Sequence, residues 1–170
     1  MLFRLLLVIP AAILSGLVTA GQQSLSLAVV LMLLFRRRYP EPWFRWALYM
    51  NQYSLRVGAY MALLVDDYPS TTDAQRVTTD ATLDESRLNR WLPLVKWLLA
   101  LPHYLVLAVL GFVMVFVLLI AWVIIVITGR FPRGLHGYVT GVLRWAWRVN
   151  AYAFLLSTDR YPPFSLSADA

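Results

Sequence analysis

Residues 97–128 read WLLALPHYLVLAVLGFVMVFVLLIAWVIIVIT and contain no charged side chain. About 20 consecutive apolar residues are enough for a helix to cross a ~30 Å hydrocarbon layer, so this stretch is typical of a membrane segment. A second apolar stretch, from Leu5 to Phe35, is interrupted only by the polar residues of segment 19–24. Together the two stretches predict a membrane protein.

The composition agrees with this prediction. Of the 170 residues, 60% are hydrophobic and 14% are charged, whereas soluble domains are about 45–50% apolar and about 25% charged. This excludes a disordered chain, and the absence of cysteine excludes a disulfide scaffold or a zinc ribbon. The net charge is +6. Because basic residues flank the apolar stretches, we expect anionic lipid headgroups as partners and no nucleic acid.

Each apolar stretch is about 30 residues long, which is long for one membrane helix and short for two. In one interpretation each forms a helical hairpin, over residues 2–35 and 92–128, with turns at segment 21–23 and near Gly111. In the other interpretation each is a single tilted helix, kinked at Pro10 or Pro102.

Basic residues favour the hairpins. They flank both ends of both stretches: Arg4, Arg36, Arg37, Arg38, Arg87, Arg90, Lys96, Arg130 and Arg133. Basic residues collect on the cytoplasmic side of membranes, and a hairpin places both of its flanks there. Gln22 and Gln23 also suit a turn better than the middle of a membrane helix. We therefore expect the polar connector and the C-terminus to be cytoplasmic.

The chain also matches itself at a spacing of 92 residues. Arg38-Tyr39-Pro40 falls on Arg130-Phe131-Pro132, and Arg56-Val57-Gly58-Ala59-Tyr60 falls on Arg148-Val149-Asn150-Ala151-Tyr152. After one inserted residue, Asp66-Asp67-Tyr68-Pro69 falls on Asp159-Arg160-Tyr161-Pro162. Such self-similarity indicates two copies of one structural unit.

The duplication divides the chain into a first repeat (1–70), a polar connector (71–91) and a second repeat (92–170). Residues 1–20 also fit a secretory signal that ends at Val18-Thr19-Ala20. Since Leu5–Val18 corresponds to a membrane segment of the second repeat, we expect it to be retained. Hairpins predict parallel repeats with a pseudo-two-fold axis along the membrane normal, whereas single spans predict inverted repeats.

Each apolar stretch is followed by a helical pattern, over residues 41–65 and 134–157. Polar residues form a narrow stripe at helical spacing, and Trp and Tyr occupy the other faces. Because Tyr and Trp prefer the membrane–water boundary, we interpret both segments as amphipathic interfacial helices. A third spanning helix over 134–157 is the alternative, against which its two central arginines argue. In the connector, residues 76–83 predict a short strand that could pair with the tail at 161–166.

The candidate site residues are the polar groups that recur on these helices. We expect contacts with lipid headgroups or with partner carboxylates from the following residues: Arg56, Arg148, Arg144, Arg38, Arg130, Tyr60 and Tyr152. For Arg56 and Arg148 the alternative is a structural pair with Asp66 and Asp159. For segment 36–38 an orientation signal is favoured over a specific lipid site.

No pattern indicates catalysis. His103 and His136 lie apart, and neither has a second ligand at metal-binding spacing. A phosphate-binding loop and a nucleophile with its base are also missing from the sequence. All nine acidic residues lie outside the apolar stretches, which argues against a proton relay. We predict no catalytic residue, metal or cofactor.

The second repeat resembles a known family in residues 90–104 (RWLPLVKWLLALPHY), 128–135 (TGRFPRGL) and 143–152 (LRWAWRVNAY). These strings are similar to the bacterial integral-membrane family called domain of unknown function 4389. The first repeat departs from the pattern at Phe35-Arg36-Arg37. The resemblance implies a multi-pass protein of the bacterial inner membrane, with an N-terminus shorter than that of many relatives, and it transfers no catalytic residue.

The fold prediction is therefore an all-α membrane protein with two tandem repeats. We expect a non-enzymatic protein that serves as an accessory or scaffold subunit of a larger membrane complex. A lipid-binding or membrane-shaping protein is the first alternative, and a component of a small transporter or channel is the second.

Overall fold

The structure is a computed structural model, which describes residues 2–36, 38–79, 81, 83, 88, 89 and 91–167. Five helices follow one another: α1 (Leu2–Arg36), α2 (Glu41–Met61), α3 (Pro93–Leu99), α4 (Leu101–Thr128) and α5 (Arg133–Ala153). The described residues contain no strand. The all-helical prediction is confirmed for this part of the chain.

The predicted hairpins within the apolar stretches are wrong. Helix α1 runs for 35 residues through Gly21 and Gln23, and α4 runs for 28 residues through Gly111. The polar segment needs no turn because the protein satisfies it in the helix. Gln22 is buried and donates to Asn150 of α5 at 3.4 Å, and the Ser24 hydroxyl donates to the Ala20 carbonyl.

The single-helix alternative describes both stretches, with different effects of proline. Helix α1 continues through Pro10. In the second unit the helix is interrupted at Ala100, where α3 ends and α4 begins, and Pro102 occupies the first turn of α4. A proline near a helix start has no N–H to leave unpaired, so it favours a new helix there.

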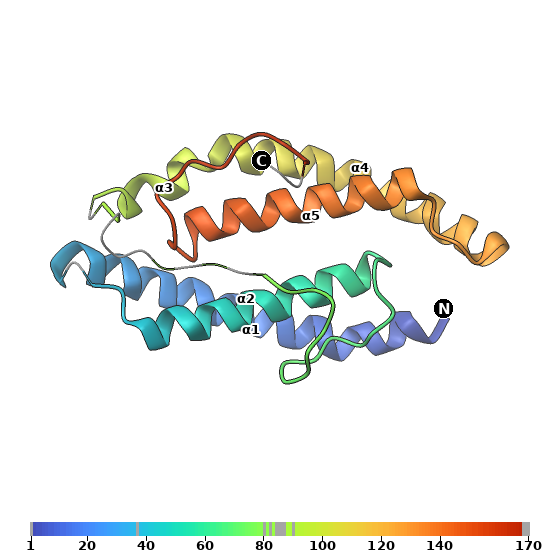
Figure 1. Cartoon of the computed structure of the whole chain (residues 1–170), viewed down its shortest axis with the longest axis horizontal. Helices are drawn as coiled ribbons and strands as arrows, with labels where there is room; N and C mark the ends of the chain where they lie inside the picture. Colours follow the sequence, from blue (N-terminus) through green and yellow to red (C-terminus); the bar gives the residue numbers. More distant parts are fainter. Residues whose placement is uncertain are drawn as a thin grey trace.

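Hairpins do occur in the structure, but each is formed by a long apolar helix and the helix that follows it, and none lies within one apolar stretch. Helix α2 turns back along α1, and α5 turns back along α4, after short loops that contain Pro40 and Pro132 (Figure 1). Both returning helices end earlier than the predicted 65 and 157. After each end, a leucine has a left-handed backbone: Leu63 with φ 61° and Leu156 with φ 56°.

The predicted strand at 76–83 is also wrong for the described positions Arg76–Thr79, Ala81 and Leu83; residues 80 and 82 lie outside the described part. The Arg56 guanidinium donates to the carbonyl of Val77 at 3.2 Å. The Arg56 side chain thus binds a backbone carbonyl that would accept a hydrogen bond from a neighbouring strand in a sheet.

The two units pack against each other through α2 and α5, which run antiparallel (Figure 1). Asn150 donates to Asn51 at 2.9 Å, and a methyl group at Gly58 would meet Leu143 at 3.9 Å. At the 92-residue spacing Asn51 corresponds to Leu143 and Gly58 to Asn150. The two contacts therefore exchange under a pseudo-two-fold rotation, and α1 and α4 are antiparallel as well.

Buried side chains concentrate where the helices meet. One cluster joins α1, α2 and the turn after α5 and includes Val29, Phe44 and Leu155. A second joins α4 and α5 around Trp145 and Tyr152. Most of the circumference of α4 and more than half of that of α1 remain exposed.

Candidate functional site: repeated ionic contacts and an arginine-lined cavity

Arg4, near the start of α1, joins the beginning of the first repeat to its end. Its guanidinium forms an ion pair with Asp66 at 2.9 Å and donates to the carbonyls of Tyr60, at 2.6 Å, and Val65. It also lies over the Tyr60 ring, 4.1 Å from the centroid. This one side chain therefore binds the chain that leaves α2 to the beginning of α1.

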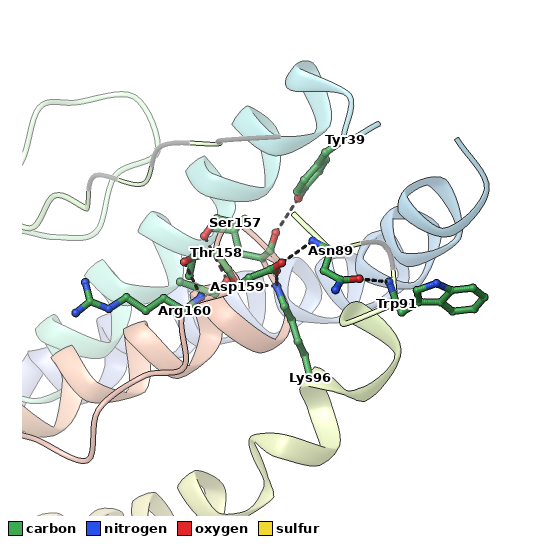
Figure 2. Close-up of polar contacts among 10 residues, drawn as sticks. Tyr39, Asn89, Trp91, Lys96, Ser157, Thr158, Asp159 and Arg160 are labelled. Atoms are coloured by element: carbon green, nitrogen blue, oxygen red, sulfur yellow. Dashed lines mark hydrogen bonds and ion pairs between the residues drawn. The ribbon is translucent and has the colours of Figure 1, made fainter. Parts of the chain in front are cut away.

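The second repeat has the same arrangement around Lys96 of α3 (Figure 2). Its ammonium lies 2.7 Å from Asp159, donates to the Thr158 carbonyl at 2.7 Å and lies 5.1 Å from the Tyr152 ring centroid. Asp159 also accepts from the backbone N–H of Asn89 at 2.5 Å. Lys96 is fully buried, and Asp159 is only 19% exposed.

These two constellations account for two of the predicted site residues. Tyr60 and Tyr152 are buried, and each holds the cation of its own repeat. Their rings are therefore covered by protein. The sequence carried a signal for this role, because Arg4 aligns with Lys96 at the same spacing as the tyrosines.

Arg56 and Arg148 lie at equivalent positions and bind equivalent targets. Arg56 is buried and donates to the Ser70 carbonyl at 2.6 Å, in addition to its bond with Val77. Arg148 donates to the carbonyls of Ser165 and Ser167 in the C-terminal segment. Neither forms the predicted alternative pair with Asp66 or Asp159, because Arg4 and Lys96 bind those carboxylates. Both arginines hold the extended segments that follow the repeats.

Arg38 and Arg130 are exposed just beyond the ends of α1 and α4. Because these helices are antiparallel, the two arginines lie at opposite ends of the molecule. The structure does not bring them together.

Arg144 lines a cavity of about 510 Å³ over the place where α2 meets α5. The walls come from both helices, from the connector and from the C-terminal segment: Leu55, Ala59, Leu64, Val65, Arg76, Val77, Thr78, Thr79, His136, Thr140, Leu143, Arg144, Trp147, Arg148 and Ser167. The volume is in the range of small-molecule sites.

The charged side chains that are described in the lining of this cavity are all basic. Arg76, Arg144 and Arg148 line it, and no acidic residue is among the described lining residues. Burial and the nearby Arg144 charge lower the pKa of Arg148 from its usual value. The cavity can therefore hold an anion that relieves the repulsion between the guanidinium groups. Arg76 was missed at the sequence level because only the folded connector brings it to α5.

Metal binding and a catalytic histidine find little support in the described part of the chain. It contains no group of three or more His, Cys, Asp or Glu side chains that could hold a metal ion. His103 is buried, accepts from the Trp145 indole at 3.2 Å and stacks on Phe164 at 3.9 Å. It has a packing role between α4, α5 and the C-terminal segment.

Comparison with protein families gives a match to the family described as domain of unknown function (DUF4389), over residues 1–72 and 90–165. The chain belongs to this family. The two matched segments coincide with the two structural units, so the tandem duplication predicted from the sequence is confirmed. Comparisons with curated proteins and with solved structures find no significant match.

Two helical segments of this family member are long and apolar enough to cross a membrane: Leu6–Arg36 and Pro93–Thr128. Only 17% and 11% of their most apolar windows are buried inside the protein. Core helices of soluble proteins are mostly buried, so these exposed apolar segments favour association with a membrane.

Proposed function

We propose that this DUF4389 protein is a non-enzymatic membrane protein that binds a phosphate or carboxylate group in its arginine-lined cavity. The observation that carries the proposal is the convergence of Arg76, Arg144 and Arg148 on one cavity, whose described lining residues include no acid. Guanidinium groups form paired hydrogen bonds with both kinds of anion. Arg148 is positioned by its bonds to the C-terminal segment, which leaves Arg76 and Arg144 to provide most of the contacts.

The membrane part of the proposal is supported by the exposed apolar helices and by the basic residues around them. From the family resemblance and the distribution of charge we infer the inner membrane of a bacterium, with the connector and C-terminal segment in the cytoplasm. Flotation with phospholipid vesicles tests this part. A chain that stays monodisperse without detergent and does not float would contradict it.

The anion site is tested with the detergent-solubilised full chain. Inorganic phosphate, glycerol phosphate and short-chain phosphatidylglycerol are titrated while thermal unfolding is followed. We expect stabilisation that is lost in the Arg144→Gln variant and retained in Arg133→Gln, which changes an exposed arginine of the same helix outside the cavity.

The three probes distinguish the source of the anion. Stabilisation by the lipid alone indicates a headgroup, whereas equal stabilisation by phosphate indicates a free anion or an anionic side chain of a partner. If none of the probes stabilises the protein, or if both variants behave like the parent chain, the cavity is not an anion site.

An accessory subunit is a second candidate function, favoured by one observation on α1. Gln23 is exposed in the middle of this apolar helix, on the same helix as exposed Thr19 and Ser24. Polar side chains on membrane helices commonly bond to a neighbouring helix. Native mass spectrometry from mild detergent tests this candidate, since a stable monomer without a co-purifying protein contradicts it.

A further inference from the structure

Helices α1 and α4 occupy the same face of the molecule. Figure 1 shows α1 passing behind α2 and α4 passing behind α5, with the connector and the C-terminal segment drawn in front. The packing agrees, since α1 contacts α2, α4 contacts α5, and α2 contacts α5. This places two long apolar helices on one side of a layer formed by α2 and α5, and it places the irregular polar segments on the other side.

The α1–α4 face is predominantly apolar, and its exposed polar side chains on α1 between residues 5 and 35 are confined to the segment with Thr19, Gln23 and Ser24. No charged residue occurs between Leu5 and Phe35 or between Trp97 and Thr128. Large side chains stand out from both helices, among them Leu6 (65% exposed), Leu17 (67%), Phe112 (67%) and Ile127 (76%). Exposed apolar surface of this extent needs a partner other than water.

The opposite face carries the irregular segments and several exposed polar residues. The connector leaves α2 at one end of the molecule and reaches α3 at the other end (Figure 1). Thr72, Asp73 and Arg76 of this irregular segment are exposed. Arg144 is exposed at about the middle of the molecule, next to the α2–α5 contact at Leu143.

These positions conflict with helices that stand upright in a bilayer. The described connector residues 66–79 would then lie in the hydrocarbon layer as irregular chain exposed to lipid, an arrangement that membrane proteins avoid. Arg144 and Arg76 would lie at the depth of the acyl chains. Helix α1, with 35 residues, is also about 52 Å long, well above the ~30 Å of hydrocarbon.

We propose that the molecule lies flat, with its long axis in the membrane plane and the α1–α4 face embedded in one leaflet of phospholipid. This rests on the membrane association proposed above. The pseudo-two-fold axis then runs along the membrane normal, and both repeats meet the leaflet with the same face. The connector, the C-terminal segment and the arginine-lined cavity face the water, so the cavity receives its anion from the aqueous side.

The orientation can be mapped with single cysteines, because the chain has none of its own. Full-length variants Leu6→Cys, Leu17→Cys and Leu31→Cys replace exposed residues along α1. They are labelled with a fluorophore and reconstituted in vesicles of three parts phosphatidylcholine to one part phosphatidylglycerol. Lipids with quenchers at known depths then report the depth of each label. Thr78→Cys, on the polar face, is the matched control.

The flat orientation predicts similar depths for the three α1 labels and no quenching by deep probes for the control. An upright helix instead gives its deepest label at Leu17→Cys and shallow labels at Leu6→Cys and Leu31→Cys, and this result would overturn the proposal. Polarised infrared spectroscopy of the unmodified chain in oriented bilayers gives a second test, independent of any variant. Helix axes near the membrane plane support the proposal, and axes near the normal overturn it.

Vesicle flotation separates this test from that of membrane association. Protein that floats but has upright helices contradicts only the flat orientation. Protein that does not float contradicts both proposals.

Discussion

At the residue scale, the duplication has kept the chemistry of a contact while changing its residues. Arg4 and Lys96 occupy equivalent positions, bind equivalent carboxylates and lie against equivalent tyrosine rings. Their surroundings differ, because Asp66 is 95% exposed whereas Asp159 is 19% exposed beside a fully buried ammonium. The equivalent ion pairs therefore contribute differently to the free energy of unfolding in the two repeats.

This difference predicts unequal effects of the same substitution. Asp159→Asn leaves the buried Lys96 ammonium without its counter-charge, so we expect a loss of about 3–5 kcal/mol in the free energy of unfolding. Asp66→Asn is the matched control and should have a much smaller effect, because water already screens that carboxylate. Thermal unfolding in detergent measures both. Equal losses in the two variants would show that burial does not set the strength of these pairs.

At the element scale, local sequence predicted the helical segments better than their ends and turns. The pattern after each Arg-(Tyr/Phe)-Pro correctly indicated the helices that became α2 and α5. The hairpin turn at Gly21–Gln23 was wrong because the contact that satisfies Gln22 comes from Asn150, 128 residues away. No local pattern contains that information. The cavity could not be predicted either, since the folded connector supplies one of its arginines.

The continuous α1 helix predicts the effect of Gly21→Ala. A Cβ at this position would meet the Trp46 ring at 3.8 Å, which is an ordinary contact. Because alanine favours a helix interior over glycine, we expect stabilisation by about 0.5–1 kcal/mol. The melting temperature in detergent measures it. A marked destabilisation would instead indicate a turn that requires glycine.

A second glycine prediction concerns the packing of the C-terminal segment against α5. A Cβ at Gly141 would lie 2.9 Å from the backbone oxygen of Leu166, closer than such atoms approach. Gly141→Ala should therefore displace this segment, and hydrogen exchange around Leu166 should become faster. Gly58→Ala is the control, because its Cβ would make only a 3.9 Å contact with Leu143. An unchanged rate of hydrogen exchange in Gly141→Ala would mean that the C-terminal segment does not pack against Gly141.

At the scale of the whole molecule, a few polar contacts join the two repeats. Asn150 donates to Asn51 and accepts from Gln22, so three helices meet at one amide. The Tyr39 hydroxyl donates to the Leu155 carbonyl at 3.0 Å. Since unpaired polar groups are costly when buried, these contacts set the register of the repeats.

The Asn51–Asn150 pair gives a test of this coupling. Asn150→Leu leaves the oxygen of buried Asn51 without its donor, and we expect a loss of about 1–3 kcal/mol in the free energy of unfolding. Adding Asn51→Leu removes the unpaired amide and should recover part of that loss. Unfolding curves of the two single variants and the double variant measure the coupling. Strictly additive losses would show that the pair does not connect the repeats.

The exchange of the Asn51–Asn150 and Gly58–Leu143 contacts under rotation has an evolutionary consequence. Two units that meet through a two-fold rotation have the backbone arrangement of a symmetric homodimer. Joining two such protomers in one polypeptide raises their effective concentration and removes the need for identical halves. Each half can therefore carry its own side chains, as Arg4 and Lys96 at the paired cation sites illustrate.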